Sequence, residues 1–510
     1  MMQTASKRIA KNTLYLYFRM FITLVVGLFT SRVVLQALGI EDYGIYNVVA
    51  GVVVMFSFIN NSMATATQRF ITYALGKEDD DYLKRIFSTS VLIFFAIAAL
   101  IIILSETVGL WFLCNKMQIP PERMDATLWV YQFSILTTVI GLFGIPYNAI
   151  IIAYEKMDVF AYLTILDVVL RLVIVFALIF FPIDKLVLYA SLIMAIQILI
   201  YLCYRFYCQK HFKVVSFNLL FDKSLFKEMF IFSGWTMTGN ISVVCYTQGL
   251  NILLNIFFGP AVNAARGVAV QVQTVIRNFC VNFQTAINPQ ITKSYAQSDF
   301  HLLHSLIITS SKFSFFLLFL LSLPVMFEAT FVLKAWLGVV PEHTENFIRL
   351  ILMTSMIIAL SNPLIIALQA TGHIKKFQIA ETLILICNPF ISYFFLKFTD
   401  TPPEIVFIVQ LCLELCAQYV RIRIILPYIQ MSKTDYMRSI VYPVLKVVCV
   451  APIVPLAMFL SIEQEIISFF AVSFSAVVSV FLSVYFLACT ADEQRMAKAM
   501  CSRAFSKFKR

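Results

Sequence analysis

The sequence predicts an all-α polytopic membrane protein with fourteen transmembrane helices. Of its 510 residues, 60% are hydrophobic and only 13% are charged, whereas soluble domains carry roughly 25% charged residues. Apolar runs of about 20 residues recur along the whole chain, and each is long enough to cross a hydrocarbon layer roughly 30 Å thick. The runs are continuous and do not alternate with polar residues, which excludes a β-barrel.

The elements follow in order along the chain. The first apolar run begins near Leu14, exceeds the length of a signal-peptide core and lacks a clear cleavage site, so it is predicted to be the first span rather than a signal peptide. The connecting loops are short, and the longest outer ones lie near 111–124 and 329–345. The fourteen spans are expected at 12–37, 43–72, 86–110, 125–153, 158–181, 186–207, 229–257, 262–291, 304–328, 346–369, 376–397, 403–425, 437–461 and 465–489.

The distribution of Lys and Arg predicts the orientation. With the N-terminus in the cytosol, the inner segments hold 25 of these residues, counting Arg421 and the basic tail, and the outer loops hold 5. Cytoplasmic loops carry such an excess. Both termini are therefore predicted to be cytoplasmic. The net charge of +11 is explained by this topology and by anionic lipid, without a nucleic-acid partner.

Two pairs of similar segments indicate an internal repeat. ATQRFITYALGKED from Ala66 resembles AINPQITKSYAQSD from Ala286, and PYNAIIIAYEKMDVF from Pro146 resembles PLIIALQATGHIKKF from Pro363. Six spans separate the copies, so both halves enter the membrane in the same direction, as in parallel-repeat transporters. We therefore expect an N-terminal lobe at 1–207, an amphipathic connector at 208–228, a C-terminal lobe at 229–425, two extra helices at 426–489 and a basic tail at 490–510.

Polar residues at membrane depth fall on helical stripes. Helical spacing of about 100° per residue aligns them in four spans, which the repeat pairs as first with seventh and second with eighth. Four arginines in these spans are the predicted binding residues of a cationic cavity: Arg19, Arg69, Arg266 and Arg277. The predicted polar lining is Thr23, Ser62, Thr65, Asn240, Thr247, Asn251, Gln273, Gln284 and Asn288. Such amides and hydroxyls also suit hydrogen bonds between helices.

Other ionisable residues within the spans have simpler interpretations. Lys312, Arg349 and Lys446 lie toward span ends, where long side chains reach the interface. Asp167 and Arg171 are four residues apart and are expected to pair, either structurally or for ion coupling, for which Glu381 is a further candidate. The cysteines and histidines show no metal-ligand pattern, so no metal and no cofactor is predicted.

The chemistry of this cavity indicates its cargo. Arginine binds phosphate through paired, charge-assisted hydrogen bonds, and a lining of amides and hydroxyls suits sugars. A lipid-linked oligosaccharide carries both groups. Replacement of Arg277, near the middle of its span, is therefore expected to abolish transport.

Several motifs resemble those of a known family. RVVLQALGIEDYGIYNVVAG with ATATQRF, the PYNAIIIAYEKM stretch, and GPAVNAARGVAVQVQ with AINPQITKSYAQ are similar to the Wzx-type polysaccharide flippases of the MOP superfamily, which also holds the MATE antiporters and the lipid II flippases. The resemblance implies two six-helix lobes in a V shape with two extra C-terminal helices. It also implies transfer of undecaprenyl-diphosphate-linked repeat units of O-antigen or capsule to the outer leaflet, with H⁺ or Na⁺ coupling. Arg19, Arg69 and Arg266 match arginines of the lipid II flippases in place.

Three alternatives are open. A MATE-type exporter of organic cations shares this architecture, but it needs carboxylates at depth, and here cations outnumber acids. A membrane glycosyltransferase or polymerase needs a sizeable outer loop with catalytic groups, and none is present, so no enzyme is predicted. A structural scaffold would have little reason to keep cations at mid-depth. The expected partners are lipid-linked oligosaccharide, membrane lipids and a polysaccharide polymerase, and the chain is expected to be monomeric.

Overall fold

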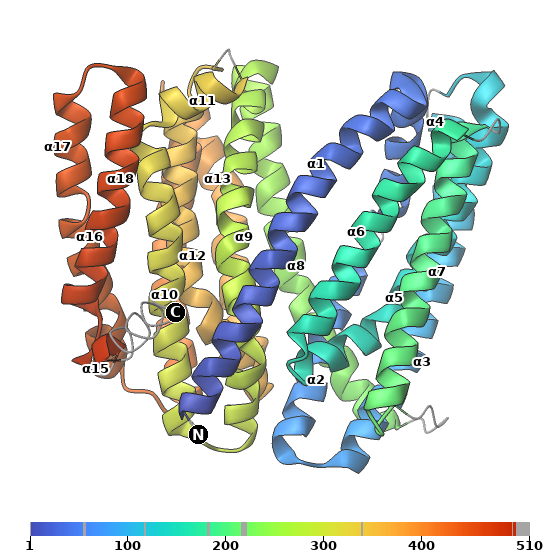
Figure 1. The fold of residues 1–510 in the computed structure, drawn as a ribbon, viewed down its shortest axis with the longest axis horizontal. Coiled ribbons are helices and arrows are strands. Elements are labelled where there is room, and N and C mark those ends of the chain that lie inside the picture. Colours follow the sequence, from blue (N-terminus) through green and yellow to red (C-terminus); the bar gives the residue numbers. More distant parts are fainter. Residues whose placement is uncertain are drawn as a thin grey trace, which may run out of the picture. The chain divides into compact units, whose positions relative to one another are not determined.

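A computed structural model describes residues 2–54, 58–116, 119–180, 184–215, 222–337, 340–491 and 493–495. These residues form helices joined by short loops, and no strand occurs among them (Figure 1). The α-helices are α1 (Met2–Val54), α2 (Phe58–Lys77), α3 (Asp80–Leu104), α4 (Leu110–Lys116), α5 (Met124–Ala153), α6 (Met157–Phe180), α7 (Lys185–His211), α8 (Lys223–Phe258), α9 (Pro260–Ala296), α10 (Phe300–Phe327), α11 (Ala329–Leu337), α12 (Thr344–Thr371), α13 (Lys375–Phe398), α14 (Ile405–Tyr428), α15 (Lys433–Tyr436), α16 (Tyr442–Val450), α17 (Ile453–Ser461) and α18 (Glu465–Ser483). Short 3₁₀ and π turns are η2 (Ser105–Gly109), η3 (Pro121–Arg123), η4 (Met437–Val441) and η5 (Val484–Ala488).

The prediction of a multi-pass, all-helical membrane protein is confirmed at this level. Eleven segments of the described chain are long and apolar enough to cross a membrane. Helices α2, α6 and α9 are not among the eleven, and α2 and α9 carry several of the predicted polar residues. The count of fourteen therefore stays a prediction.

Helix α1 joins what the sequence presents as two spans. A straight helix of its 53 residues would be about 80 Å long, but the blue ribbon bends at its upper end and returns (Figure 1). Arg123 marks that bend, because it bonds Asp42 of α1 through Nε at 2.9 Å and Asp184 through Nη1 at 2.5 Å. The guanidinium thus ties the bend of α1 to the start of α5 and of α7.

Aspartates before the first turn begin several helices. Asp79, Asp184 and Asp222 each accept backbone N–H groups of the helix that follows, as N-cap residues do. Burial alone would raise the pKa of Asp184, but the hydrogen bonds from Arg123 and from the backbone of α7 hold that pKa below its ordinary value of 3.8. The carboxylate is therefore ionised at neutral pH and serves both as a cap and as an ion-pair partner.

The predicted span 437–461 is not one regular helix. It consists of η4, α16 and α17, with Pro443 in the first turn of α16 and Pro452 just before α17. Proline lacks the backbone N–H that an α-helix needs at interior positions, which explains the interruptions. In Figure 1, α17 continues upward from α16 in one column, and α18 stands beside that column.

The described chain divides into two compact units. The first holds Met1–Asn240 and Thr285–Asp299, and the second holds Ile241–Gln284 and Phe300–Arg510. The first turns of α8 and the last turns of α9 thus pack with the helices of the first half of the chain. This division differs from the predicted boundary at 207–229, so the lobes expected from the repeat stay a prediction. Most of the predicted tail 490–510 and part of the connector 208–228 lie outside the described residues.

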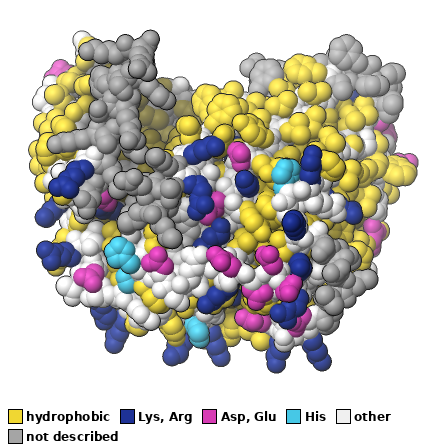
Figure 2. Space-filling model, turned by 60° about the horizontal axis from the view of Figure 1, so that its bottom comes forward, with side chains coloured by type: hydrophobic (Ala, Val, Ile, Leu, Met, Phe, Trp, Pro, Cys, Tyr) yellow, Lys and Arg dark blue, Asp and Glu magenta, His cyan; other side chains and the backbone are white. Residues whose placement is uncertain are grey.

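Charged side chains gather on one face of the molecule. Figure 2 shows Lys and Arg in dark blue, with Asp and Glu among them, on the lower part of the face that comes forward, while hydrophobic side chains predominate above. Two inner-loop residues of the predicted topology, Lys84 and Arg85, contact Asp81 and Asp222. The side of the membrane on which these residues lie stays a prediction.

Candidate functional site

In the first unit, Arg69 of α2 is surrounded by aromatic rings. Its guanidinium carbon lies 4.4 Å from the ring centre of Phe70 and 5.3 Å from those of Tyr73 and Phe232. A cation over an aromatic face is stabilised by the ring quadrupole, most strongly where water is absent. Arg69 is partly buried in this arrangement, so the ring of Phe232 brings α8 to the predicted binding residue.

Polar residues join α2 to α8 in the same unit. Asn240 donates from Nδ2 to Oγ of Ser62 at 2.9 Å, and the hydroxyl of Ser233 donates to the sulfur of Met63 at 2.9 Å. Ser62 is buried, Asn240 is exposed and Thr65 is half-buried in α2. The structure therefore brings together two residues that the sequence assigned to stripes on separate helices.

Arg19 and Thr23 lie on α1 against α6. The Arg19 guanidinium carbon is 4.6 Å from the ring centre of Phe160, and the hydroxyl of Thr23 donates to the Arg19 carbonyl at 2.9 Å. On α6, Nε of Arg171 donates to both carboxylate oxygens of Asp167 at 3.0 and 3.1 Å. Asp167 and Arg171 thus form the contact expected from their spacing, and the choice between a structural role and ion coupling stays a prediction.

In the second unit, Arg266 of α9 is held by α8. It donates through Nη1 to the side-chain oxygen of Asn251 and through Nη2 to the Thr247 carbonyl at 3.1 Å. Its Nε is buried without a hydrogen-bond partner. The Thr247 hydroxyl bonds the Val243 carbonyl of its own helix at 2.8 Å, so Asn251 is the lining residue that the structure joins to the arginine.

The amides of the α9 stripe contact α12. Gln273 donates to the Ser355 hydroxyl at 2.6 Å, and Gln284 donates to the Ala359 carbonyl at 3.0 Å while accepting from Asn362 at 2.7 Å. These bonds match the alternative that such residues hold helices together. Asn288, which belongs to the first unit, keeps its side-chain oxygen buried without a hydrogen-bond partner.

Arg277 differs from the other predicted arginines. It is exposed in the middle of α9, and within the described part of the chain its guanidinium has neither an ion-pair nor a hydrogen-bond partner. A cation at membrane depth is costly unless water or an anion reaches it. Among the four predicted arginines in the described residues, Arg277 is thus the one with an exposed side chain.

A buried ionic cluster in the second unit was missed by the sequence analysis. Arg421 of α14, counted there as an inner-loop residue, is 4% exposed. Its guanidinium bonds Glu381 of α13 at 2.5 Å, the Ser361 hydroxyl of α12 at 2.9 Å, and the carboxylate of Glu414. Two carboxylates therefore share one cation, which gives the cluster one excess negative charge when both are ionised. The sequence did offer one indication of this cluster: Glu414 and Arg421 are seven residues apart and therefore lie on one face of α14.

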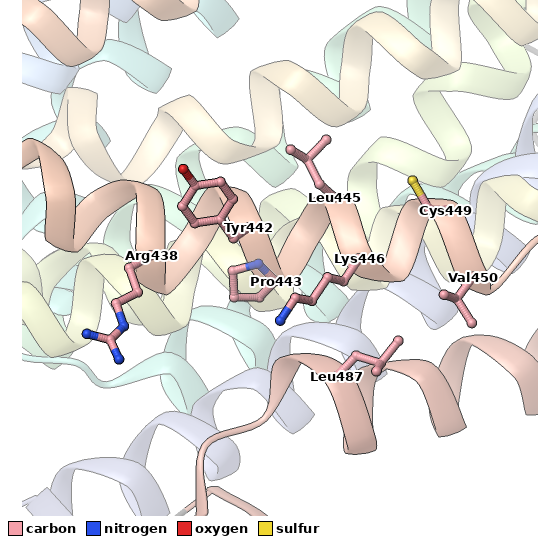
Figure 3. Close-up of a pocket in the computed structure, with 8 residues that line it drawn as sticks. All are labelled: Arg438, Tyr442, Pro443, Leu445, Lys446, Cys449, Val450 and Leu487. Carbon is pink, nitrogen blue, oxygen red and sulfur yellow. The ribbon is translucent and has the colours of Figure 1, made fainter.

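The three cations expected to reach the interface behave differently. Lys312 is 1% exposed and donates to both oxygens of Glu493 at 2.9 and 2.8 Å and to the Ala488 carbonyl at 3.0 Å, so the expectation that it reaches the interface is wrong. Arg349 donates to the Met326 carbonyl at 2.9 Å. Lys446 is exposed and lines a groove of about 740 Å³ with Arg438, Tyr442 and Leu487, formed by η4, α16 and η5 (Figure 3). None of the predicted site residues lines that groove.

Comparisons with known proteins identify the family and the fold. A profile described as polysaccharide biosynthesis protein matches residues 9–295, more than half of the chain. No curated relative matches the chain.

Solved structures with the same fold are MATE and MOP-superfamily transporters. A point mutant of a MATE protein is 14% identical with a TM-score of 0.71, and the match covers 83% of this chain and 96% of that one. An outward-facing multidrug resistance MATE transporter is 13% identical with a TM-score of 0.68 over 84% and 96%. A MOP-superfamily transporter from Pyrococcus furiosus, described as having a binding pocket of reverse polarity, is 13% identical with a TM-score of 0.67 over 84% and 97%. The chain therefore belongs to the polysaccharide biosynthesis protein family and has the fold of the MOP-superfamily transporters, as its resemblance to the Wzx-type flippases predicted.

Proposed function

We propose that this protein moves undecaprenyl-diphosphate-linked oligosaccharide units from the inner to the outer leaflet of a bacterial inner membrane by alternating access. The observation that carries this proposal is the exposed, unpartnered guanidinium of Arg277 within the described part of a transporter of the polysaccharide family. A diphosphate supplies the anion that such a cation needs. The sugar-facing groups are polar side chains of α8 in the second unit, Thr247 and Asn251 among them.

The alternative is a MATE-type exporter of small organic cations, and the fold supports it equally. A bulky cationic drug requires carboxylates exposed enough to contact it, but the side chains of Glu381 and Glu414 are only 15% and 5% exposed. The solved MOP transporter with a pocket of reverse polarity shows that this fold is not tied to one polarity. The arginine content at membrane depth favours an anionic headgroup here.

Directional transport needs an energy source. A ligand shifts a conformational equilibrium only by its differential affinity for the two states. We propose a proton or sodium gradient as that source, as the family resemblance implies, and Glu381 and Glu414 are the carboxylates of the second unit at membrane depth. Their excess charge over Arg421 gives them a reason to bind a cation.

The test is Arg277→Ala in a flippase-deficient strain complemented with this gene. Loss of charge-assisted contacts worth about 1.5–3 kcal/mol should lower surface polysaccharide roughly 10- to 100-fold at equal protein level. Arg277→Lys keeps the charge and should retain part of the export. Lys446→Ala, which removes an exposed cation outside the polar stripes, is the matched control and should export normally.

Purified protein in liposomes separates the two functions. The expected result is transfer of a fluorescent polyprenyl-diphosphate oligosaccharide, with no binding of cationic dyes. Normal surface polysaccharide in the Arg277→Ala strain, or dye binding without lipid transfer, would overturn the proposal.

A further inference from the structure

The first turns of α8 and the last turns of α9 are packed against the helices of the first half. The sequence repeat assigns both helices to the second half, yet residues up to Asn240 and from Thr285 to Asp299 belong to the first compact unit. The predicted topology places these ends at the cytoplasmic side. Their contacts with α1, α2 and the α5–α6 loop therefore lie where a headgroup would have to enter from the cytosol.

Part of the contact between these helix ends is apolar. The rings of Phe70 on α2 and Phe232 on α8 lie 6.0 Å apart, centre to centre. Leu16 of α1, Met157 of α6 and Ala286 of α9 form a cluster in which each residue is fully buried. Apolar packing of this kind excludes water, but it includes no ion pair or hydrogen bond that could be exchanged when the helix ends separate.

The ends of α2 and α9 touch at backbone distance. A Cβ atom added to Gly76 would lie 2.6 Å from Cβ of Ala296 and 3.0 Å from the Lys293 carbonyl. These separations are shorter than side-chain contacts in proteins, so only glycine permits this approach. Any larger residue at position 76 must push the two helix ends apart.

Glu155, in the α5–α6 loop, makes polar contacts with α1 and with the end of α9. Its side chain is 1% exposed and accepts from Arg8 of α1 at 2.7 Å, from Lys293 of α9 at 3.1 Å and from Gln290 of α9 at 3.0 Å. The residue follows α5 with a backbone φ of +58°, a conformation that residues other than glycine seldom adopt. A strained backbone that aims a buried carboxylate at donors from two helices indicates a function beyond closing a loop.

We propose that Glu155 is the latch of a gate formed by α1, α2, α8 and α9, which is closed in this structure and must open for the headgroup to enter. The inference rests on the proposed function. When the ends of α8 and α9 move away, Glu155 exchanges Lys293 and Gln290 for water while it keeps Arg8. The same movement frees Arg69, Ser62 and Asn240 from their contacts across α2 and α8, and so makes predicted binding residues available on the inner side.

The test measures exposure of a buried gate position. Ser294 of α9 is 1% exposed. Ser294→Cys, placed in a chain whose native cysteines are replaced by Ala or Ser, is treated with a water-soluble maleimide in purified protein. Glu155→Gly removes the latch but suits the left-handed backbone, so the loop keeps its conformation. The labelling rate should rise about tenfold or more, because charge-assisted contacts of the closed state are lost.

The control is Glu78→Gly, in the α2–α3 loop. Glu78 has a φ of +57° and is exposed, so this change repeats the backbone effect without a buried contact and should leave labelling unchanged. Lys293→Gln and Gly76→Ala should each raise the rate as well, by weakening the latch and by separating α2 from α9.

Unchanged labelling in Glu155→Gly and Lys293→Gln, or rapid labelling of the parent, would overturn the latch. Labelling needs no substrate, so its result is independent of whether the protein transports a lipid-linked oligosaccharide. If labelling supports the latch but the protein does not transport polysaccharide units, the gate is retained and only the proposed cargo is rejected.

Discussion

Two buried charged side chains, Glu155 and Arg421, each contact more than one partner. The carboxylate of Glu155 accepts from Arg8, Lys293 and Gln290, and the guanidinium of Arg421 donates to Glu381, Glu414 and Ser361. A buried ion is tolerated only when its remaining donors or acceptors are satisfied. Removal of the shared member of such a group therefore leaves several uncompensated atoms at once.

Arg421→Gln should destabilise the protein strongly. The change leaves Glu381 and Glu414, whose side chains are 15% and 5% exposed, facing each other without a countercharge. Loss of one partner of a buried pair costs about 3–5 kcal/mol. Thermal unfolding of purified protein in detergent measures the effect, and adding Glu381→Gln should restore part of the stability. Arg423→Gln alters an exposed arginine of the same helix and is the control; equal unfolding temperatures for the two variants would contradict the prediction.

At the scale of helices, small residues set how closely neighbours approach. Gly249 of α8 faces the ring of Pro389 on α13, and an added Cβ would lie 2.8 Å from its Cγ. Small residues permit such close approach between membrane helices. Gly234, on the same helix, has nothing within 4 Å of an added Cβ.

Gly249→Ala should therefore destabilise the second unit, although alanine favours helix. Overpacking costs about 1–3 kcal/mol, which exceeds the gain of up to about 1 kcal/mol from replacing a helical glycine. Gly234→Ala should be neutral or stabilising. Unfolding curves in detergent compare the two, and a stabilised Gly249→Ala variant would show that α8 and α13 are not in this contact.

Across the whole molecule, the orientation can be tested with single cysteines. Asp400, in the loop between α13 and α14, and Gln297, between α9 and α10, are both exposed. The predicted topology places them on opposite sides, outer and inner respectively. In intact spheroplasts of cells expressing the cysteine-free chain, an impermeant maleimide should label Asp400→Cys at once and Gln297→Cys only after permeabilisation. The reverse order would invert the topology and the side of the proposed gate.

The apolar runs and helical spacing predicted much of the fold and part of the site. They predicted an all-helical membrane chain and the contact of Asp167 with Arg171, because these depend on neighbours along one helix. The family was predicted by the resemblance of several motifs. Helical spacing locates a polar face but does not identify what the face meets. Gln273 and Gln284 accordingly turned out to bond α12, and Arg421 was counted as a loop residue although it is buried. The Glu155 contacts draw on segments more than 100 residues apart, which no local pattern reveals.

Two of the π turns offer a carbonyl group to a buried side chain. The Ser105 carbonyl of η2 accepts the Tyr131 hydroxyl at 2.7 Å, and the Ala488 carbonyl of η5 accepts Lys312. A π turn has the length of an α turn with one residue inserted. Deleting a residue from η5 would restore the regular helix and rotate everything beyond it by about 100°, carrying Glu493 away from Lys312. Loss of one residue from η5 would therefore leave the buried ammonium group of Lys312 without its carboxylate partner.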